Sequence, residues 1–191
     1  CLVEHGRVGP VVGVAFDGLG LGLDGGLWGG EILVADLVAA ERVGHLRPVA
    51  LPGGSRAIRE PWRMAVAWAH QVLGRDAALE VGAGLDRRAT DLVALLDGGG
   101  VRTTTSAGRL FDAVAALLGV RSIATYEGQA AVELEALAHP VPPSEAPRYE
   151  VVVDREGPVG VLDPAPMIAA VIAARARVEP VASIAAGARE L

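Results

Sequence analysis

A glycine-rich segment that begins with an aspartate is the most distinctive chemical feature of the sequence. Residues 17–26 have the sequence DGLGLGLDGG, and half of them are glycine. Because glycine has no Cβ, such a segment lets backbone N–H groups turn toward an anion such as phosphate. Asp17 stands at its start, where a carboxylate can hold a divalent metal ion that bridges phosphates. The pattern fits a plain β-hairpin with a loose glycine turn as well, and taken alone it favours that simpler interpretation.

Two arginines near a predicted helix start form a second candidate. Arg59 and Arg63, in the segment AIREPWR, are four residues apart and are expected to share one helix face. Two guanidinium groups on one face suit the binding of an anionic group, so these are the candidate catalytic residues. The alternative is a solvent-exposed helix terminus with Trp62 packed beneath it, which is the usual role of such a pattern.

A third candidate lies at the start of a helix predicted over residues 106–118. Gly108, Arg109 and Asp112 fall in its first turns. The free N–H groups of a helix N-terminus attract anions, so this segment could bind a phosphate. The alternative is an ordinary N-cap formed by Ser106.

Other reactive residue types are scarce. The four histidines, at positions 5, 45, 70 and 139, form no metal-binding pair of known spacing. Cys1 and His5 together supply only two ligands, too few for a site, so we interpret them as structural. All 17 basic residues are arginine. The absence of lysine excludes a phosphate-binding loop lysine, a Schiff-base lysine and a biotinyl or lipoyl lysine.

The composition predicts a folded protein with an aliphatic core. Of the 191 residues, 51% are apolar and only 4% are aromatic, and the mean hydropathy is +0.39. A net charge of −6 argues against a nucleic-acid partner, which would require basic residues to neutralise phosphates. No apolar run reaches the roughly 18–20 residues of a membrane span, and no signal peptide is visible. We therefore expect a cytoplasmic protein that does not bind membranes.

Hydrophobic periodicity predicts strands near the N-terminus and helices after them. Segments 10–16 and 27–35 are predicted to form a hairpin around the glycine-rich segment, which is itself predicted to be a loop. Short strands are also expected at 47–51 and 148–153, and a proline-rich loop at 140–147. Helices are predicted over 61–74, 86–96, 106–118, 127–138, 166–178 and 180–190. The predicted fold class is therefore α/β or α+β, with a β-hairpin layer followed by packed helices.

In order and spacing, the sequence resembles the carbamoyltransferase domain of HypF, a [NiFe]-hydrogenase maturation protein. The similar segments are GVAFDGLGLGLDGGLWGGEIL, HLRPVALPGG, AIREPWRMA, TSAGRLFDAVAALLG and TYEGQAAVELEALA. The resemblance runs from Cys1 to about Ala138 and is weaker from 140 to 191. It implies part of an actin-like ATPase (ASKHA) domain, as in the TsaD-like relatives. Residues 1–139 would be the core of that domain, and 140–191 a loop, a strand and helices of the same domain, incomplete at the C-terminus.

The resemblance also implies a function. HypF-like proteins use carbamoyl phosphate and ATP to make carbamoyl-adenylate. They then transfer the carbamoyl group to the C-terminal cysteine of HypE, from which the cyanide ligand of the hydrogenase iron is made. Two alternatives stay open: an O-carbamoyltransferase acting on a small-molecule hydroxyl, and a non-catalytic nucleotide-binding module. The family's HHxAH metal motif is expected before Cys1 and its SGG segment beyond Leu191, so the chain alone is expected to be inactive.

Individual residues acquire roles from the same resemblance. Asp17 matches the family's metal-binding aspartate, for an ion that could be Fe, Mg or Zn. Asp112 matches the acid that meets the nucleotide ribose in the TsaD-like relatives, and Gln129 replaces the second glycine of a pair that approaches the nucleotide. Arg59 and Arg63 match a family motif to which no role is assigned. The residues implied in nucleotide binding are Gly18, Gly20, Gly22, Gly108, Asp112, Gly128 and Gln129.

Overall fold

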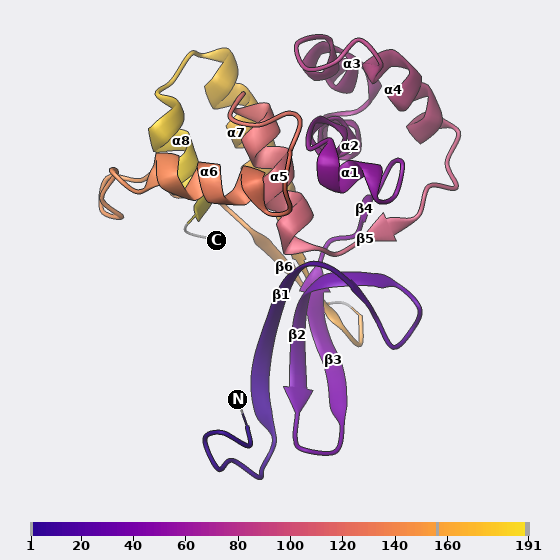
Figure 1. Cartoon of the computed structure of the whole chain (residues 1–191), viewed down its shortest axis with the longest axis vertical. Coiled ribbons are helices and arrows are strands. Elements are labelled where there is room, and N and C mark those ends of the chain that lie inside the picture. Colours follow the sequence, from indigo (N-terminus) through magenta and orange to yellow (C-terminus); the bar gives the residue numbers. More distant parts are fainter. Residues whose placement is uncertain (1, 156, 190–191) are drawn as a thin grey trace.

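Three long antiparallel strands form the N-terminal part of the structure, a computed structural model that describes residues 2–155 and 157–189. They are β1 (Val11–Leu21), β2 (Leu27–Ala35) and β3 (Ala40–Leu46), with β2 paired to both of the others. Figure 1 shows them as an arm that projects from a body of helices. β3 was not predicted, and Cys1, the first residue of the Cys1–His5 pair, lies outside the described residues.

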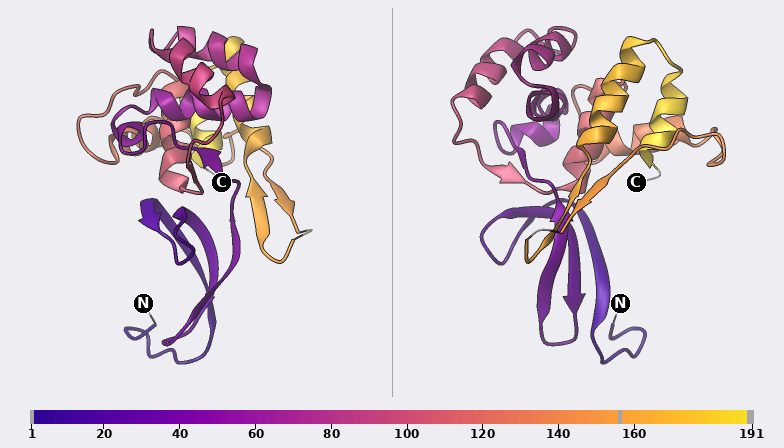
Figure 2. Two further views of the ribbon diagram at one scale, coloured as in Figure 1. Left: turned by 90° about the vertical axis from the view of Figure 1, so that its right-hand side faces the viewer. Right: turned by 180° about the vertical axis from the view of Figure 1, so that it is seen from behind.

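Four short strands complete the sheet. They are β4 (Val49–Ala50), β5 (Thr103–Thr104), β6 (Val152–Asp154) and β7 (Gly160–Asp163). The strand order is β4-β5-β2-β3-β7-β6, with β1 paired to β2 off this path. β7 runs parallel to β3, so the C-terminal part of the chain joins the same sheet as the first strands. The turned views in Figure 2 show the β6–β7 hairpin beside the arm.

Half of the glycine-rich segment is strand, so the prediction of a loop over residues 17–26 is wrong for residues 17–21 and holds for 22–26. β1 continues to Leu21, and its register with β2 shifts between Phe16 and Gly20, which forms a bulge at residues 17–19. The turn itself begins only at Gly22, whose N–H donates to the Gly26 carbonyl oxygen at 2.8 Å. Pairing with β2 offsets the conformational entropy that glycine loses in a strand. The strand propensities of the individual residues do not show that this pairing forms.

All six predicted helices are confirmed, with boundaries shifted by up to three residues, over the part of the chain that the structure describes. Two more, the first and third, were not predicted. The α3 segment holds only two apolar residues larger than alanine, Leu79 and Val81, which are too few to show a helical period. None of the helices in the described residues is long and apolar enough to cross a membrane. The helices are α1 (Arg56–Arg59), α2 (Trp62–Leu73), α3 (Arg75–Ala83), α4 (Ala89–Asp97), α5 (Ala107–Leu117), α6 (Gln129–Ala138), α7 (Ala165–Ala176) and α8 (Val181–Arg189).

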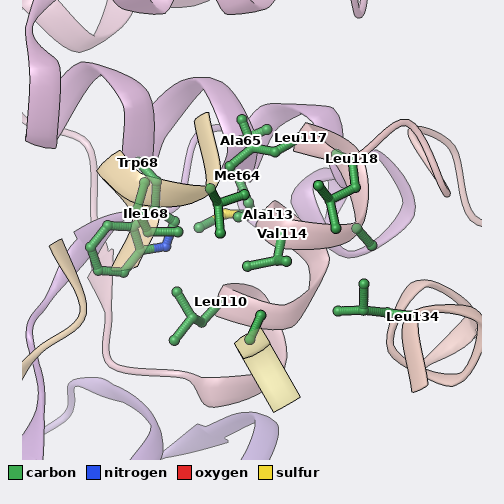
Figure 3. Close-up of a cluster of buried hydrophobic side chains, with 14 of the residues drawn as sticks. Met64, Ala65, Trp68, Leu110, Ala113, Val114, Leu117, Leu118, Leu134 and Ile168 are labelled. Carbon is green, nitrogen blue, oxygen red and sulfur yellow. The ribbon is translucent and has the colours of Figure 1, made fainter. Parts of the chain in front are cut away.

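The core is built around α5, which packs against α2, α6 and α7. Ala113 and Val114 of α5 are fully buried, as are Met64 of α2 and Ile168 of α7. Figure 3 shows these side chains meeting in one cluster. Burying each large aliphatic side chain stabilises the fold by about 1.5–3 kcal/mol. This packing fixes the position of the α5 N-terminus, which the helix presents to the sheet.

One face of β1 is left uncovered. Val12, Val14 and Phe16 alternate along the strand, so they share a face of the sheet, and their exposed fractions are 71%, 62% and 58%. The arm therefore contributes little to the core. Its end nearest the helices, where the bulge lies, is the part that packs.

Candidate functional site

Ser106 ties the bulge of β1 to the N-terminus of α5. Its Oγ lies 2.9 Å from the carbonyl oxygen of Asp17 and 2.5 Å from that of Gly18. The same oxygen accepts a hydrogen bond from the backbone N–H of Arg109 at 3.1 Å, so the predicted N-cap is confirmed. Residues nearly ninety positions apart in the sequence thus meet at one hydroxyl group.

Glycines let the backbones of β1, β2 and α5 come closer than side chains would permit. A Cβ on Gly108 would lie 2.7 Å from the Cα of Gly18. A Cβ on Gly29, which has a φ of +150°, would lie 2.6 Å from the carbonyl oxygen of Asp17. The first turn of α5 therefore lies directly against the bulge. The N–H of Arg109 is bonded to Ser106, so the N–H groups of Ala107 and Gly108, which have no acceptor within the helix, are the ones that an anion there could use.

The segment that precedes α6 reaches the same bulge through the side chain of Glu127. Glu127 Oε1 and Arg109 Nη2 each lie 3.8 Å from the position that a Cβ on Gly18 would take. Gly128 adopts the left-handed conformation with a φ of +79°, and no side chain caps α6. On this side the bulge therefore meets the carboxylate of Glu127 beside the guanidinium of Arg109, and the helix N-terminus that lies against the β1 glycines is that of α5.

Arg109 and Asp112 form a buried ion pair beneath this surface. Arg109 Nη2 lies 2.9 Å from Asp112 Oδ2, and the exposed fractions of the two side chains are 3% and 4%. Within the described residues, Arg109 Nε, Arg109 Nη1 and Asp112 Oδ2 have no hydrogen-bond partner. Burial raises the pKa of the Asp112 carboxyl to about 6, and the positive charge of Arg109 acts in the opposite direction.

Asp17 lies at the surface of the bulge. Its side chain is exposed, and its Oδ1 accepts a hydrogen bond from the backbone N–H of Gly18 at 2.6 Å. Over residues 2–155 and 157–189, no three His, Cys, Asp or Glu side chains come together as a possible metal site. Asp17 is well placed for a cation at the bulge, but the described chain does not complete a metal site around it.

Gly20 and Gly22 differ in their surroundings. A Cβ on Gly20 would lie 3.4 Å from Asp17 Oδ2, so Gly20 belongs to the same surface as the bulge. A Cβ on Gly22 would lie 2.3 Å from the indole ring of Trp28. Gly22 is therefore needed for packing within the hairpin, whatever else it contacts.

The Gln129 side chain holds the loop before α6. Its Oε1 accepts hydrogen bonds from the N–H and the hydroxyl of Thr125 at 2.8 and 3.1 Å. Its Nε2 donates to Glu133 Oε1 at 2.9 Å. These bonds fix the loop that carries Gly128, so the Gln129 side chain has a supporting role within that loop.

The predicted pairing of Arg59 and Arg63 on one helix face is wrong. α1 ends at Arg59 and α2 begins at Trp62, because Pro61 cannot continue the first helix. Arg63 Nε donates to Glu60, and its guanidinium lies 4.8 Å from the centre of the Trp62 ring. Arg59 is exposed. The structure does not bring these arginines together as a single anion-binding pair.

Glu31 is a buried side chain at the site that sequence analysis missed. It is 2% exposed, and its Oε2 accepts hydrogen bonds from the N–H groups of Gly29 and Gly30 at 2.6 and 2.8 Å. Its Oε1 accepts from Arg42 Nη2 at 3.1 Å and from the hydroxyl of Thr105. Glu31 thereby joins β2, β3 and the segment before α5. An acid within the otherwise apolar segment LWGGEILVA was the available signal.

Comparison with known proteins shows where this architecture belongs. A family model described as the second subdomain of the Kae1-like carbamoyltransferase domain matches residues 13–190. The carbamoyltransferase HypF2 of Cupriavidus necator is 50% identical over 145 residues, which are 72% of this chain and 17% of that protein. HypF of Rhizobium leguminosarum bv. viciae is 53% identical over 131 residues, which are 68% of this chain and 17% of that protein.

Solved structures agree. Full-length HypF in its phosphate- and nucleotide-bound form superposes with a TM-score of 0.86 at 35% identity, over 98% of this chain and 24% of that one. HypF of T. kodakarensis gives a TM-score of 0.81 at 26% identity, over 97% of this chain and 25% of that one.

These matches confirm the fold class: a mixed α/β domain of the actin-like ATPase type, as in the Kae1-like domain of HypF. The chain belongs to the HypF carbamoyltransferase family. It spans about 17% of the length of the curated relatives and about 24% of the full-length crystal structure.

Proposed function

We propose that this chain forms part of the nucleotide-binding site of a HypF-type carbamoyltransferase. The observation that carries the proposal is the meeting of the β1 bulge with the N-terminus of α5, in a chain that is similar to nucleotide-bound HypF over 98% of its length. Close backbone approach, a helix N-terminus and a nearby arginine are features that suit a phosphate-bearing ligand.

In the proposed reaction, carbamoyl-adenylate made from carbamoyl phosphate and ATP donates its carbamoyl group to the C-terminal cysteine of a HypE-like protein. A C–S bond forms at the carbamoyl carbon, its bond to the phosphate oxygen breaks, AMP leaves and the thiol proton is released. The N–H groups around Gly18 and in the first turn of α5 bind the phosphate, and Asp112 accepts a hydrogen bond from a ribose hydroxyl. The same contacts hold the leaving AMP in place during transfer.

A metal at this site would be held in part by Asp17, whose carboxylate is exposed at the bulge. Carboxylate oxygens suit divalent cations, and affinity rises with the number of protein ligands. Because the described residues do not complete a ligand set, we derive no catalytic step through a metal. The role of Asp17 is best established by substitution.

Asp17→Ala, made in a full-length HypF protein that carries this sequence, tests the proposal. We expect transfer to the acceptor cysteine to fall at least about tenfold and bound metal to decrease, because a carboxylate ligand worth over 1.4 kcal/mol is removed. Asp36→Ala is the matched control. Asp36 is also an exposed aspartate that accepts backbone hydrogen bonds, but it lies in the β2–β3 turn. Unchanged transfer and metal content in the folded Asp17 variant would contradict the assignment.

A further inference from the structure

The ion pair between Arg109 and Asp112 has more hydrogen-bonding capacity than its surroundings use. Arg109 carries five N–H donors and an ionised Asp112 accepts at two oxygens. Arg109 Nε and Nη1 are nevertheless buried and without a partner in the described part of the chain, and Asp112 Oδ2 has only its ion pair with Arg109 Nη2. Buried polar atoms are nearly always satisfied, so such a cluster calls for a specific explanation.

The position of the pair supplies that explanation. The same Nη2 atom lies 2.9 Å from Asp112 Oδ2 and 3.8 Å from the Cβ position of Gly18, so the pair lies directly beneath the β1 bulge. The guanidinium of Arg109 is thus next to the surface at which the nucleotide is proposed to bind. A half-satisfied buried ion pair is weak evidence for a purely stabilising role, because desolvation offsets much of the attraction.

Other charges do not replace Arg109 in this environment. The titratable and charged side chains on the elements packed against α5 are Asp17, Glu31, Arg56, Arg59, Arg63, His70, Glu127, Glu133, Glu135, Arg175 and Arg189. Glu31 is engaged by Arg42, and Glu133 by Arg121. Among the described residues, the charge that acts on the Asp112 carboxyl is that of Arg109.

We infer that Arg109 is a positioning residue for nucleotide binding: its guanidinium holds the buried Asp112 carboxylate beneath the β1 bulge as a charged acceptor for a ligand hydroxyl group. The inference rests on the proposed function. Asp112 touches the ligand, and Arg109 acts through Asp112.

The electrostatics of the pair agree with this role. Burial raises the pKa of Asp112 to about 6, and Arg109 limits the rise. Without Arg109, the pKa of Asp112 rises further, and the carboxyl is protonated over a wider range of pH. A neutral carboxyl is a poorer hydrogen-bond acceptor than a carboxylate. Loss of Arg109 therefore makes nucleotide binding dependent on pH near neutrality.

The experiment measures the Kd for AMP by calorimetry between about pH 5 and about pH 9, in a full-length HypF protein that carries this sequence. Wild-type affinity is expected to fall only as the pH drops through about 6. In Arg109→Met, the midpoint rises by roughly one to three pH units, so affinity at pH 7 falls between about twofold and a hundredfold and recovers as the pH is raised. Arg109→Lys keeps the charge and stays within about threefold of wild type.

Two results would overturn the inference: an Arg109→Met affinity that is reduced equally at every pH, or one that is not reduced at all. If Arg109→Met does not fold, Asp112→Asn decides, measured with adenosine because the phosphate of AMP itself gains a proton near pH 6. A midpoint near pH 6 that persists for adenosine without the carboxyl cannot belong to Asp112. NMR titration of the Asp112 carboxyl without nucleotide separates this inference from the proposed function. Wild-type protein that binds no AMP refutes both the proposed function and the ligand-positioning role, even if the Asp112 midpoint still depends on Arg109. Wild-type protein that binds AMP, with an Asp112 midpoint unmoved by Arg109→Met, refutes the role of Arg109 alone.

Discussion

Gly108→Ala adds a single methyl group at the closest contact between β1 and α5. That methyl would lie 2.7 Å from Gly18 Cα and 3.3 Å from both Gly18 N and the carbonyl oxygen of Asp17. All three atoms belong to the backbone, so relief requires movement of the bulge or of the helix. Overpacking of this kind costs about 1–3 kcal/mol, whereas alanine at an unobstructed helical position gains about 0.5–1 kcal/mol. The expected net loss in the free energy of unfolding is therefore about 1–2 kcal/mol.

Urea denaturation measures this loss directly, and thermal unfolding should show a Tm lower by about 2–4 °C for each kcal/mol. Gly84→Ala is the matched control. Gly84 also has right-handed helical backbone angles, and a Cβ there would lie 3.7 Å from the nearest atom, the carbonyl oxygen of Val81. The control should be unchanged or slightly more stable. If Gly108→Ala is as stable as Gly84→Ala, the two backbones do not meet as closely as described, and the argument from close approach fails.

Two further predictions concern the dependence of stability on pH. Hydrogen bonds from Arg88 lower the pKa of Asp86 to about 2, below the value of 3.8 expected on unfolding, so this stabilisation is present above about pH 4 and lost as the pH falls toward 2. Asp86→Asn should therefore cost about 1–2 kcal/mol near neutral pH and almost nothing at pH 2, as measured by denaturation at each pH. The pKa of Asp112 is shifted in the opposite direction. Its value of about 6 in the folded protein lies above the 3.8 expected on unfolding, so the stabilisation that this group contributes is complete below about pH 4 and is lost as the pH rises through 6. Asp112→Asn should lower the free energy of unfolding overall, because Arg109 loses its partner. It should also remove the change in the free energy of unfolding, up to about 3 kcal/mol, that the wild type shows between pH 4 and 6. A wild-type slope in this variant would contradict the raised pKa.

The helices of this fold could be predicted because their apolar residues recur with the helical period. The helix at 106–118 is the best case, since Ser106 caps it as its position indicates and its apolar face forms the centre of the core. The length of β1 could not be predicted. Its glycines disfavour a strand locally, and the contacts that stabilise it come from β2 and from Ser106, far along the chain.

The candidate site could be predicted only in part, for a related reason. Asp17 and Gly108 stand out in local patterns, and the structure places both at the β1 bulge. Glu31 does not stand out in a local pattern, because a single acid in an apolar strand has no spacing that indicates which residues it contacts. The supposed helix face of Arg59 and Arg63 failed because spacing alone cannot show that Pro61 separates two helices.

The backbone contact at the bulge also constrains how this region can change by mutation. A side chain on Gly29 and one on Gly108 would both press on the carbonyl oxygen of Asp17, in the same bulge. Once one methyl group has displaced the bulge, part of the room for the second already exists, so neighbouring substitutions are not additive. A sequence that departs from these glycines must first pass through a less stable single variant. Amino-acid substitutions at Gly29 and Gly108 are therefore expected to occur together during evolution, because the two positions are close in space and affect the same bulge.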